Sequence, residues 1–281
     1  AAMALARGKE APVAELVKLL HSPRLESRYG ACQALAMRKG AAAPAVPALK
    51  SILRHNDLWL RVKAAEALAA IGQPAMSAVP ELLQMLAKGP TETDPRAMEQ
   101  RYLCFALFDQ RGGLIGRSLT GVDREALYAA VRAGLRNEDG RARGSIASVY
   151  RVLSYEEIRA LLPAVHQAVI QPAPSGIMFA DEIRVEGLRI LAKHRVKEGI
   201  DACVKYTRTQ NPWASEKRTP ELMQILLGYG AHAKSMIPEL EQIADYFEND
   251  EEDFPRNLGL GKAKVIRETI RAINASNEYP E

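Results

Sequence analysis

The sequence predicts an all-α fold, an α-solenoid of about seven stacked helical hairpins. Apolar residues recur at three- and four-residue spacing on both sides of short polar turns along nearly the whole chain. Segments of the chain also repeat one another at an offset of 33 residues. The composition agrees with this, because Ala, Leu and Arg dominate, aromatic residues make up only 6%, and β-branched runs between turn signals are scarce.

The internal repeat is clearest in two pairs of segments. Residues 16–53 align with residues 49–86, with leucine, arginine and proline positions shared. The run IGQPAMSAVPELLQM, which begins at Ile71, returns as YGAHAKSMIPELEQI, which begins at Tyr229. Such self-similarity is typical of repeat proteins, in which each unit stacks on the next to bury a continuous core.

Each repeat is predicted to hold a first helix, A, and a second helix, B. The A helices are expected near residues 12–20, 46–54, 78–87, 123–136, 156–170, 198–207 and 237–247. The B helices are expected near residues 25–38, 58–71, 96–110, 141–153, 180–194, 217–229 and 259–274. Residues 1–8 resemble the end of a further B helix. We therefore expect a single repeat domain over residues 1–281, a fragment of a longer protein that starts in mid-repeat.

Local signals at the helix starts support this division. Prolines stand in the first turn of predicted A helices, where a missing N–H costs no hydrogen bond: Pro47, Pro80, Pro163 and Pro238. Residues that cap helices stand before predicted B helices: Ser22, Asp57, Asp94 and Asp139. Within the B helices, alanines such as Ala64 and Ala65 let neighbouring helices approach closely, while Leu68 fills the seam.

Charge and cysteine content limit the function classes. The net charge is +4, but residues 239–253 hold eight acidic residues and no Lys or Arg, so the rest of the chain is more basic than the total. A basic body can attract nucleic acid, anionic lipid or an acidic protein, although solvated helix faces explain most of its charge. Cys32, Cys104 and Cys203 lack the spacing of a metal site, and we expect them to be buried.

One motif carries a family resemblance. It consists of Asp57, Leu60, Arg61, Ala64, Ala65, Leu68, Ile71, Gly72, Val79, Pro80 and Leu82, and it resembles the HEAT repeat of bacterial proteins. The resemblance implies HEAT-like hairpins wound into a right-handed superhelix. It also implies an Asp–Arg ladder that ties adjacent repeats together. Asp57 and Asp139 fit the Asp position, and the Arg position is fitted by Arg28, Arg61, Arg101, Arg143 and Arg184. In the first pair Arg24 stands at the Asp position, which departs from the pattern.

Motifs of catalytic sites are absent from the sequence. There is no H-E-x-x-H, no G-x-S-x-G and no His-Glu dipeptide, which iron hydroxylases built of HEAT repeats would need. The run from Gly259 to Lys262 lacks the Ser or Thr of a phosphate loop and is expected to start a helix. Phycobilin lyases and base-excision glycosylases are also built from such repeats, so an enzyme stays as a third alternative. We expect no catalysis, no cofactor and no metal.

Enlarged turns point to a binding edge. Four of the seven A-to-B turns are long, at residues 88–96, 171–180, 207–216 and 247–258. Because every A-to-B turn of a solenoid emerges on the same edge, we expect these insertions to form one ridge that marks the binding face. Apolar residues in them are expected to contact a partner: Met178, Phe179, Trp213 and Phe254. The alternative is that they cover the ends of their own helices.

Trp59 is predicted to be exposed, because the equivalent position in other repeats holds Glu26, Glu99, Arg141 and Glu182. We expect it to bind a partner, with packing on a neighbouring loop as the alternative. Its replacement by alanine should then change the free energy of unfolding by less than about 0.5 kcal/mol, as is usual for a surface residue.

The sequence therefore favours a non-catalytic protein–protein interaction scaffold that offers a concave B-helix face and an edge of inserted loops to a protein or peptide. A nucleic-acid-binding solenoid that uses the basic body is the alternative. No stretch reaches about 18 consecutive apolar residues, so we expect no membrane insertion. The lack of a signal peptide favours the cytoplasm, and the oligomeric state is left open.

Overall fold

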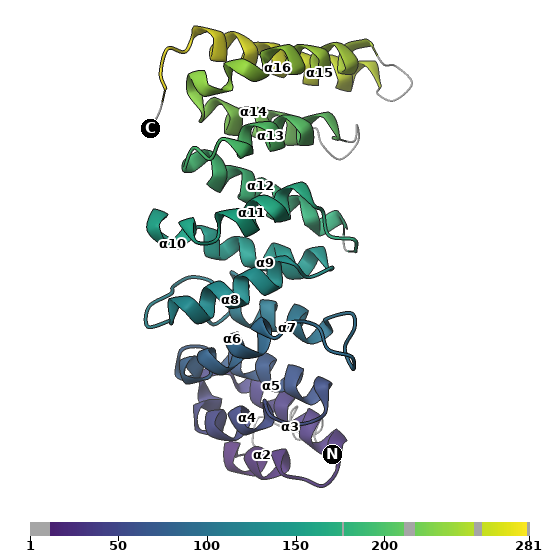
Figure 1. Cartoon of the computed structure of the whole chain (residues 1–281). Coiled ribbons are helices and arrows are strands. Elements are labelled where there is room, and N and C mark those ends of the chain that lie inside the picture. The colour runs from purple at the N-terminus through teal and green to yellow at the C-terminus, as the bar shows by residue number, and fades with distance from the viewer. Residues whose placement is uncertain (1–11, 176, 211–216, 250–254, 280–281) are drawn as a thin grey trace. The chain divides into compact units, whose positions relative to one another are not determined.

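Helices account for nearly all regular structure in the computed structural model, which describes residues 12–175, 177–210, 217–249 and 255–279. Residues 177–181 are described by their backbone only. Within these ranges there are fifteen α-helices and three 3-10 helices, and the β-pairing is limited to two isolated bridges (Figure 1). The predicted all-α fold is confirmed. None of the described helices is long and apolar enough to cross a membrane.

Seven A–B hairpins follow one another along the chain, as predicted. The A helices are α2 (Val13–Leu20), α4 (Val46–Ile52), α6 (Val79–Ala87), α8 (Arg124–Leu135), α11 (Leu162–Ile170), α13 (Glu198–Arg208) and α15 (Ile237–Asn249). The B helices are α3 (Leu25–Arg38), α5 (Leu58–Ile71), α7 (Met98–Phe108), α9 (Gly140–Tyr150), α12 (Ile177–Lys193), α14 (Arg218–Leu227) and α16 (Arg256–Ala275).

The predicted A helix at residues 156–170 is in fact two helices, α10 (Tyr155–Arg159) and α11. Pro163 stands in the first turn of α11, and a proline both lacks an N–H and disfavours helical geometry in the residue before it. The chain therefore breaks between the two helices. The 3-10 helices were not predicted, and they precede α4, α6 and α15: η1 (Lys39–Ala45), η2 (Gln73–Ala78) and η3 (Gly230–Met236).

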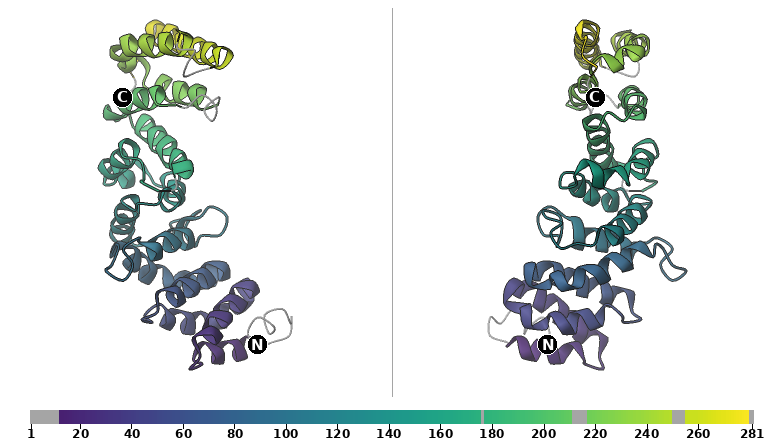
Figure 2. Two further views of the ribbon diagram at one scale, coloured as in Figure 1. Left: turned by 90° about the vertical axis from the view of Figure 1, so that its right-hand side faces the viewer. Right: turned by 60° about the vertical axis from the view of Figure 1, so that its left-hand side comes forward.

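The chain divides into two compact units. Unit 1 comprises residues 1–164 and 172–183, and unit 2 comprises residues 165–171 and 184–281. In unit 1 each B helix packs on the next one, α3 on α5, α5 on α7 and α7 on α9, while α6 packs on α8 (Figure 2). In unit 2, α13 packs on α14 and α15, and α16 packs on both α14 and α15.

Small and aliphatic residues of the B helices form the seams between hairpins. Ala64, Ala65 and Leu68 are fully buried in α5, as the repeat pattern predicts. The three cysteines are buried as well. Burial raises the pKa of the Cys32 thiol to about 12 and raises the pKa of Cys104 and Cys203 too. All three thiols therefore stay protonated and behave as core residues.

Acidic side chains cap three of the B helices. Asp57 accepts a hydrogen bond from the Leu60 amide at 2.7 Å, and Asp139 accepts one from the Arg141 amide at 2.8 Å. Asp94 lies further from its helix, α7, yet its carboxylate binds the first two free amides there, those of Met98 and Glu99. Ser22 differs from the prediction, because Arg24 holds the cap position of α3 and has no side-chain cap bond.

Candidate interaction surface

Arginines at one position of the B helices link successive repeats in unit 1. Each side chain reaches a residue of the following repeat, which holds neighbouring hairpins in register. Three such links are present: Arg28 to His55 Nε2 (2.8 Å), Arg61 to Glu99 Oε1 (2.5 Å), and Arg101 to Asp139 Oδ2 (3.2 Å). Only the last of them joins an arginine to an aspartate. The repeat pattern indicates aspartate as the partner of this arginine, so it does not predict the acceptors His55 and Glu99.

The same arginine position also fixes the turn that precedes its own helix. Side chains of three B helices donate to the carbonyl six residues earlier: Arg28 to Ser22 (2.5 Å), Arg61 to His55 (2.7 Å) and Arg143 to Asn137 (2.6 Å). Arg184, in unit 2, donates instead to the Val169 carbonyl at 3.1 Å, and its guanidinium lies 3.7 Å from the Tyr206 ring centroid. These arginines therefore hold turns and repeats together, and we assign them a structural role.

Asp57 differs from the predicted ladder, because no ion pair joins it to an arginine among the described residues. Its carboxylate instead accepts the Tyr29 hydroxyl of the preceding repeat at 2.6 Å, besides the Leu60 amide. The guanidinium of Arg61 is bound to Glu99 and acts on Asp57 only through its charge. Burial alone raises the pKa of Asp57, but the two hydrogen bonds and nearby positive charge outweigh it, and the pKa lies below its usual value.

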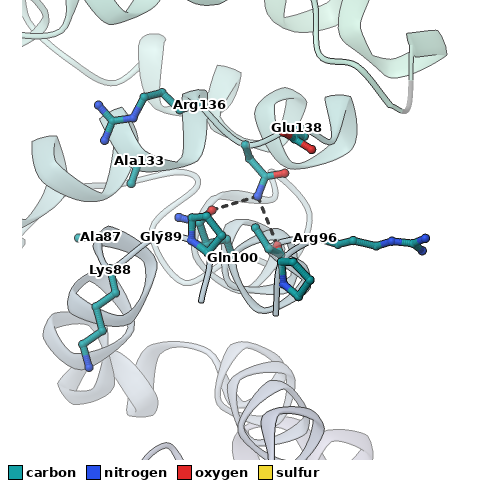
Figure 3. A pocket seen from close by; sticks show the side chains of 12 residues that line it. Ala87, Lys88, Gly89, Arg96, Gln100, Ala133, Arg136 and Glu138 are labelled. Atoms are coloured by element: carbon teal, nitrogen blue, oxygen red, sulfur yellow. Dashed lines mark hydrogen bonds between the residues drawn. The ribbon is translucent and has the colours of Figure 1, made fainter. Parts of the chain in front are cut away.

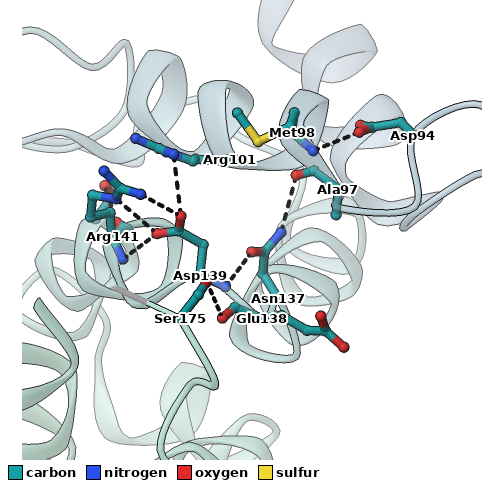
Figure 4. A network of polar contacts seen from close by, with 10 residues as sticks. Asp94, Ala97, Met98, Arg101, Asn137, Glu138, Asp139, Arg141 and Ser175 are labelled. Atoms are coloured by element: carbon teal, nitrogen blue, oxygen red, sulfur yellow. Dashed lines mark hydrogen bonds and ion pairs between the residues drawn. The ribbon is translucent and has the colours of Figure 1, made fainter. Parts of the chain in front are cut away.

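Asp139 lies at the centre of a polar network in unit 1 (Figure 4). Its buried carboxylate is shared by Arg101 and by Arg141, which donates from Nε at 3.1 Å and from Nη2 at 3.0 Å. Burial alone raises the pKa of Asp139, yet the hydrogen bonds from Arg141 and the charge of Arg101 lower it further than burial raises it. Two guanidinium groups, one from α7 and one from α9, thus share one carboxylate.

An aromatic surface, defined here as Trp59, Tyr102 and Phe105, extends from α5 onto α7. The Trp59 side chain is 45% exposed, and its ring meets Tyr102 edge to face with centroids 5.8 Å apart. Tyr102 meets Phe105 in the same way at 5.9 Å. The Arg101 guanidinium lies 5.6 Å from the Tyr102 centroid and 5.7 Å from that of Phe105. Trp59 therefore packs on the next repeat and is also exposed to solvent.

A shallow pocket of about 530 Å³ continues the aromatic surface onto α9. Phe105 lines it from α7, Arg141 and Ser145 from α9, and Glu182 from α12. The Ser145 hydroxyl donates to the Arg141 carbonyl at 3.1 Å, and neither histidine nor cysteine lines the pocket. That hydroxyl hydrogen is therefore engaged with a backbone carbonyl. The pocket therefore offers contacts for binding.

Three A-to-B turns of unit 1 lie side by side on one edge, and those before α7 and α12 are two of the enlarged turns. Asn137 Nδ2 donates to the Ala97 carbonyl at 3.3 Å, which joins the turns at residues 88–97 and 136–140. Ser175 then donates its hydroxyl to the Glu138 carbonyl at 2.9 Å, which adds the turn at residues 172–175 (Figure 4). These turns form a continuous bonded ridge.

A second pocket, of about 360 Å³, opens in this ridge between α6, α7 and α8 (Figure 3). The buried amides of Gln100 and Asn137 form its floor, with Asn137 Nδ2 donating to Gln100 Oε1 at 3.1 Å. Lys88, Arg96 and Arg136 stand around it. We define these three residues as the cationic rim. Sequence patterns gave no sign of this pocket, because the conformation of two turns brings its residues together.

Trp59 is the one predicted partner-binding residue whose side chain the structure describes. Met178 and Phe179 lie in α12, but their side chains are outside the described set, and Trp213 and Phe254 lie outside the described residues altogether. Among the described residues, no group of three or more His, Cys, Asp or Glu side chains is arranged to hold a metal ion.

Residues 13–100 match the family model described as HEAT repeats, which confirms the HEAT-like repeats predicted in that part of the chain. No curated protein shows significant similarity to the chain. Among solved structures, the chain is similar to the crystal structure of an engineered protein, with 19% sequence identity and a TM-score of 0.39. That similarity covers 94% of this chain and 98% of the engineered one.

Proposed function

We propose that this chain, in which residues 13–100 are HEAT repeats, is a non-catalytic scaffold that binds a protein or peptide through the aromatic surface of unit 1. HEAT repeats generally serve as scaffolds for protein interactions, because stacked helical hairpins present extended binding surfaces. The observation that carries the proposal is Trp59, which remains 45% exposed although its ring packs on Tyr102. Exposed tryptophan and tyrosine on rigid helices are typical anchors of protein interfaces.

The surroundings of Trp59 support an anchor role. Tyr102 is held between Trp59 and Phe105 and beneath the Arg101 guanidinium, so these rings lose little side-chain freedom when a partner binds. Arg101 and Arg141, which share the Asp139 carboxylate, are the charged residues beside the rings. Aromatic residues at the centre with charged residues around them are the usual composition of a protein interface.

The test uses peptides selected from a random display library against the wild-type chain, with binding measured by fluorescence anisotropy. We expect Trp59→Ala and Tyr102→Ala each to weaken the binding of the selected peptides by about 30-fold, equivalent to about 2 kcal/mol of binding free energy. Met37→Ala is the matched control, because Met37 is an exposed apolar residue of unit 1 outside the aromatic surface. Equal affinity for the wild type and both aromatic variants would contradict the proposal.

Nucleic acid is the second candidate partner, and the three exposed cations of the rim are the observation that favours it. The salt dependence of the binding affinity distinguishes the two candidate partners. A nucleic-acid complex loses about tenfold or more in affinity between about 50 and 200 mM salt, because bound phosphates release counterions. A complex anchored by Trp59 should lose much less over the same range.

A further inference from the structure

We infer that the pocket in the ridge of unit 1 is a second recognition site, and that it binds an acidic segment of a protein partner. The inference rests on the proposed function in one respect, that the partner is a protein. It uses none of the residues of the aromatic surface. The pocket lies between the turn at residues 88–97 and the turn that begins at Arg136 (Figure 3).

The cationic rim carries charge that the chain does not neutralise. Lys88, Arg96 and Arg136 are exposed, and within the described residues none of them takes part in an ion pair or a side-chain hydrogen bond. Other arginines of unit 1, such as Arg61, are bound to carboxylates and carbonyls. Glu138 is the one acidic residue that lines the pocket. The rim therefore has an excess of positive charge available to a ligand.

Interactions with helix ends give a structural reason for two of the three cations of the rim, but not for the third. Lys88 follows α6 and Arg136 follows α8, and the carboxyl end of a helix attracts cations. That end carries only about half a negative charge, which is too little to neutralise a full cation. Arg96 lies in the inserted turn before α7 and follows no helix end. A structural role at helix ends therefore does not explain the whole positive charge of the cationic rim.

The floor of the pocket suits an extended peptide. The Gln100 amide is fixed by donating to the Leu86 carbonyl at 2.8 Å and by accepting from Asn137. An amide nitrogen has two hydrogens, so Gln100 Nε2 can donate a second hydrogen bond besides the one to Leu86. Pro90 and Pro95 form rigid apolar walls that can contact a small side chain between two acidic ones.

The directions in which the three cationic side chains extend favour a ligand with several carboxylates over a single phosphate. In Figure 3 the side chains of Lys88, Arg96 and Arg136 extend from the pocket in three different directions, so their charges do not meet at one point. A single compact anion cannot reach all three. Free amides at a helix start would cradle a phosphate, but Asp94 already binds those of α7. Carboxylates spaced along a peptide can reach each cation in turn.

The probe for the first test is a fluorescein-labelled peptide of five Glu-Ala units, measured by anisotropy at low salt. We expect the triple variant Lys88→Ala, Arg96→Ala, Arg136→Ala to weaken its binding by at least about tenfold. The matched control removes three exposed cations elsewhere in unit 1, Arg24→Ala, Lys39→Ala and Arg159→Ala, and should change the affinity by less than about twofold. None of these side chains is buried, so both triple variants should stay folded. The rim variant should melt only slightly below the wild type, because two of the cations that it loses follow helix ends.

Three results would overturn the inference: no binding of the acidic peptide by the wild type, equal weakening by both triple variants, or displacement of the peptide by millimolar inorganic phosphate. A ten-nucleotide oligothymidylate is the second probe. If it binds more tightly than the peptide and depends on the cationic rim, the site is a nucleic-acid site and the inference is wrong. Trp59→Ala should leave binding of the acidic peptide unchanged, so a failure of this site and a failure of the proposed function can be told apart.

Discussion

Single side chains in unit 1 combine helix capping with contacts between repeats, and Asp57 is the clearest case. Its carboxylate accepts the Leu60 amide of its own helix and the Tyr29 hydroxyl of the preceding repeat. Asp57→Ala removes both bonds and should lower the free energy of unfolding by about 1–2 kcal/mol. Urea unfolding measures this, with Asp57→Asn as the control that retains a capping oxygen and should lose less. An unchanged midpoint for the alanine variant would contradict the assigned role.

The pKa of Asp139 lies below its usual value, so the stability that this carboxylate contributes depends on pH. The contribution is fully present above the unfolded-state pKa of about 3.9 and is lost as the pH falls through the folded-state value. We expect the wild type to be more stable than Asp139→Asn at pH 7 and the difference to shrink as the pH drops below about 4. Unfolding curves between pH 7 and pH 2 test this, and a constant difference would argue against a paired carboxylate.

Trp59 shows what repeat alignment can and cannot predict for one residue. The alignment predicted exposure, because other repeats hold charged residues there, but it did not predict that Tyr102 of the next repeat meets the ring edge to face. An edge-to-face ring pair contributes about 0.5–1.5 kcal/mol, so Trp59→Ala should lower the free energy of unfolding of unit 1 by about that much. The sequence alone predicted a change of less than about 0.5 kcal/mol. Thermal unfolding of Trp59→Ala and Tyr102→Ala checks this, since either variant removes the same ring pair.

At the scale of helices and turns, periodicity and caps predicted the elements well. Both signals are local, so the bounds of α5 agree with the predicted 58–71. The 3-10 helices were missed because they have no apolar period. The pocket in the ridge was missed for another reason, that Gln100 and Asn137 are 37 residues apart and meet only through the conformation of two turns.

Packing of α13 depends on a residue without a side chain. A Cβ atom added at Gly199 would lie 2.8 Å from the Leu191 Cβ and would also collide with the Tyr229 hydroxyl. Gly199→Ala should therefore destabilise unit 2 by about 1–3 kcal/mol through overpacking. Gly261→Ala is the matched control, because nothing lies within 4 Å of its added Cβ in α16. The control should gain up to about 1 kcal/mol in helix propensity. Equal melting temperatures for the two variants would contradict this account.

At the scale of the whole molecule, the repeats determine how far a local change spreads. Each hairpin of a repeat stack contacts its neighbours, so stability is approximately a sum of terms for repeats and for the interfaces between them. Gly199 belongs to unit 2 and Asp57 to unit 1. The effects of Gly199→Ala and Asp57→Ala should therefore be independent, and in the double variant they should add to within about 0.5 kcal/mol.

Native-state hydrogen exchange can locate each effect. Gly199→Ala should speed amide exchange in α13 and α14 and leave α3 and α5 protected, and Asp57→Ala should give the opposite pattern. The physical reason is that each substitution breaks contacts inside one unit, and exchange reports the local opening of the segment that lost them. Exchange measured on proteolytic fragments by mass spectrometry resolves these helices. If either variant accelerates exchange equally in both units, the chain opens as one cooperative block and its stability is not a sum over neighbouring repeats.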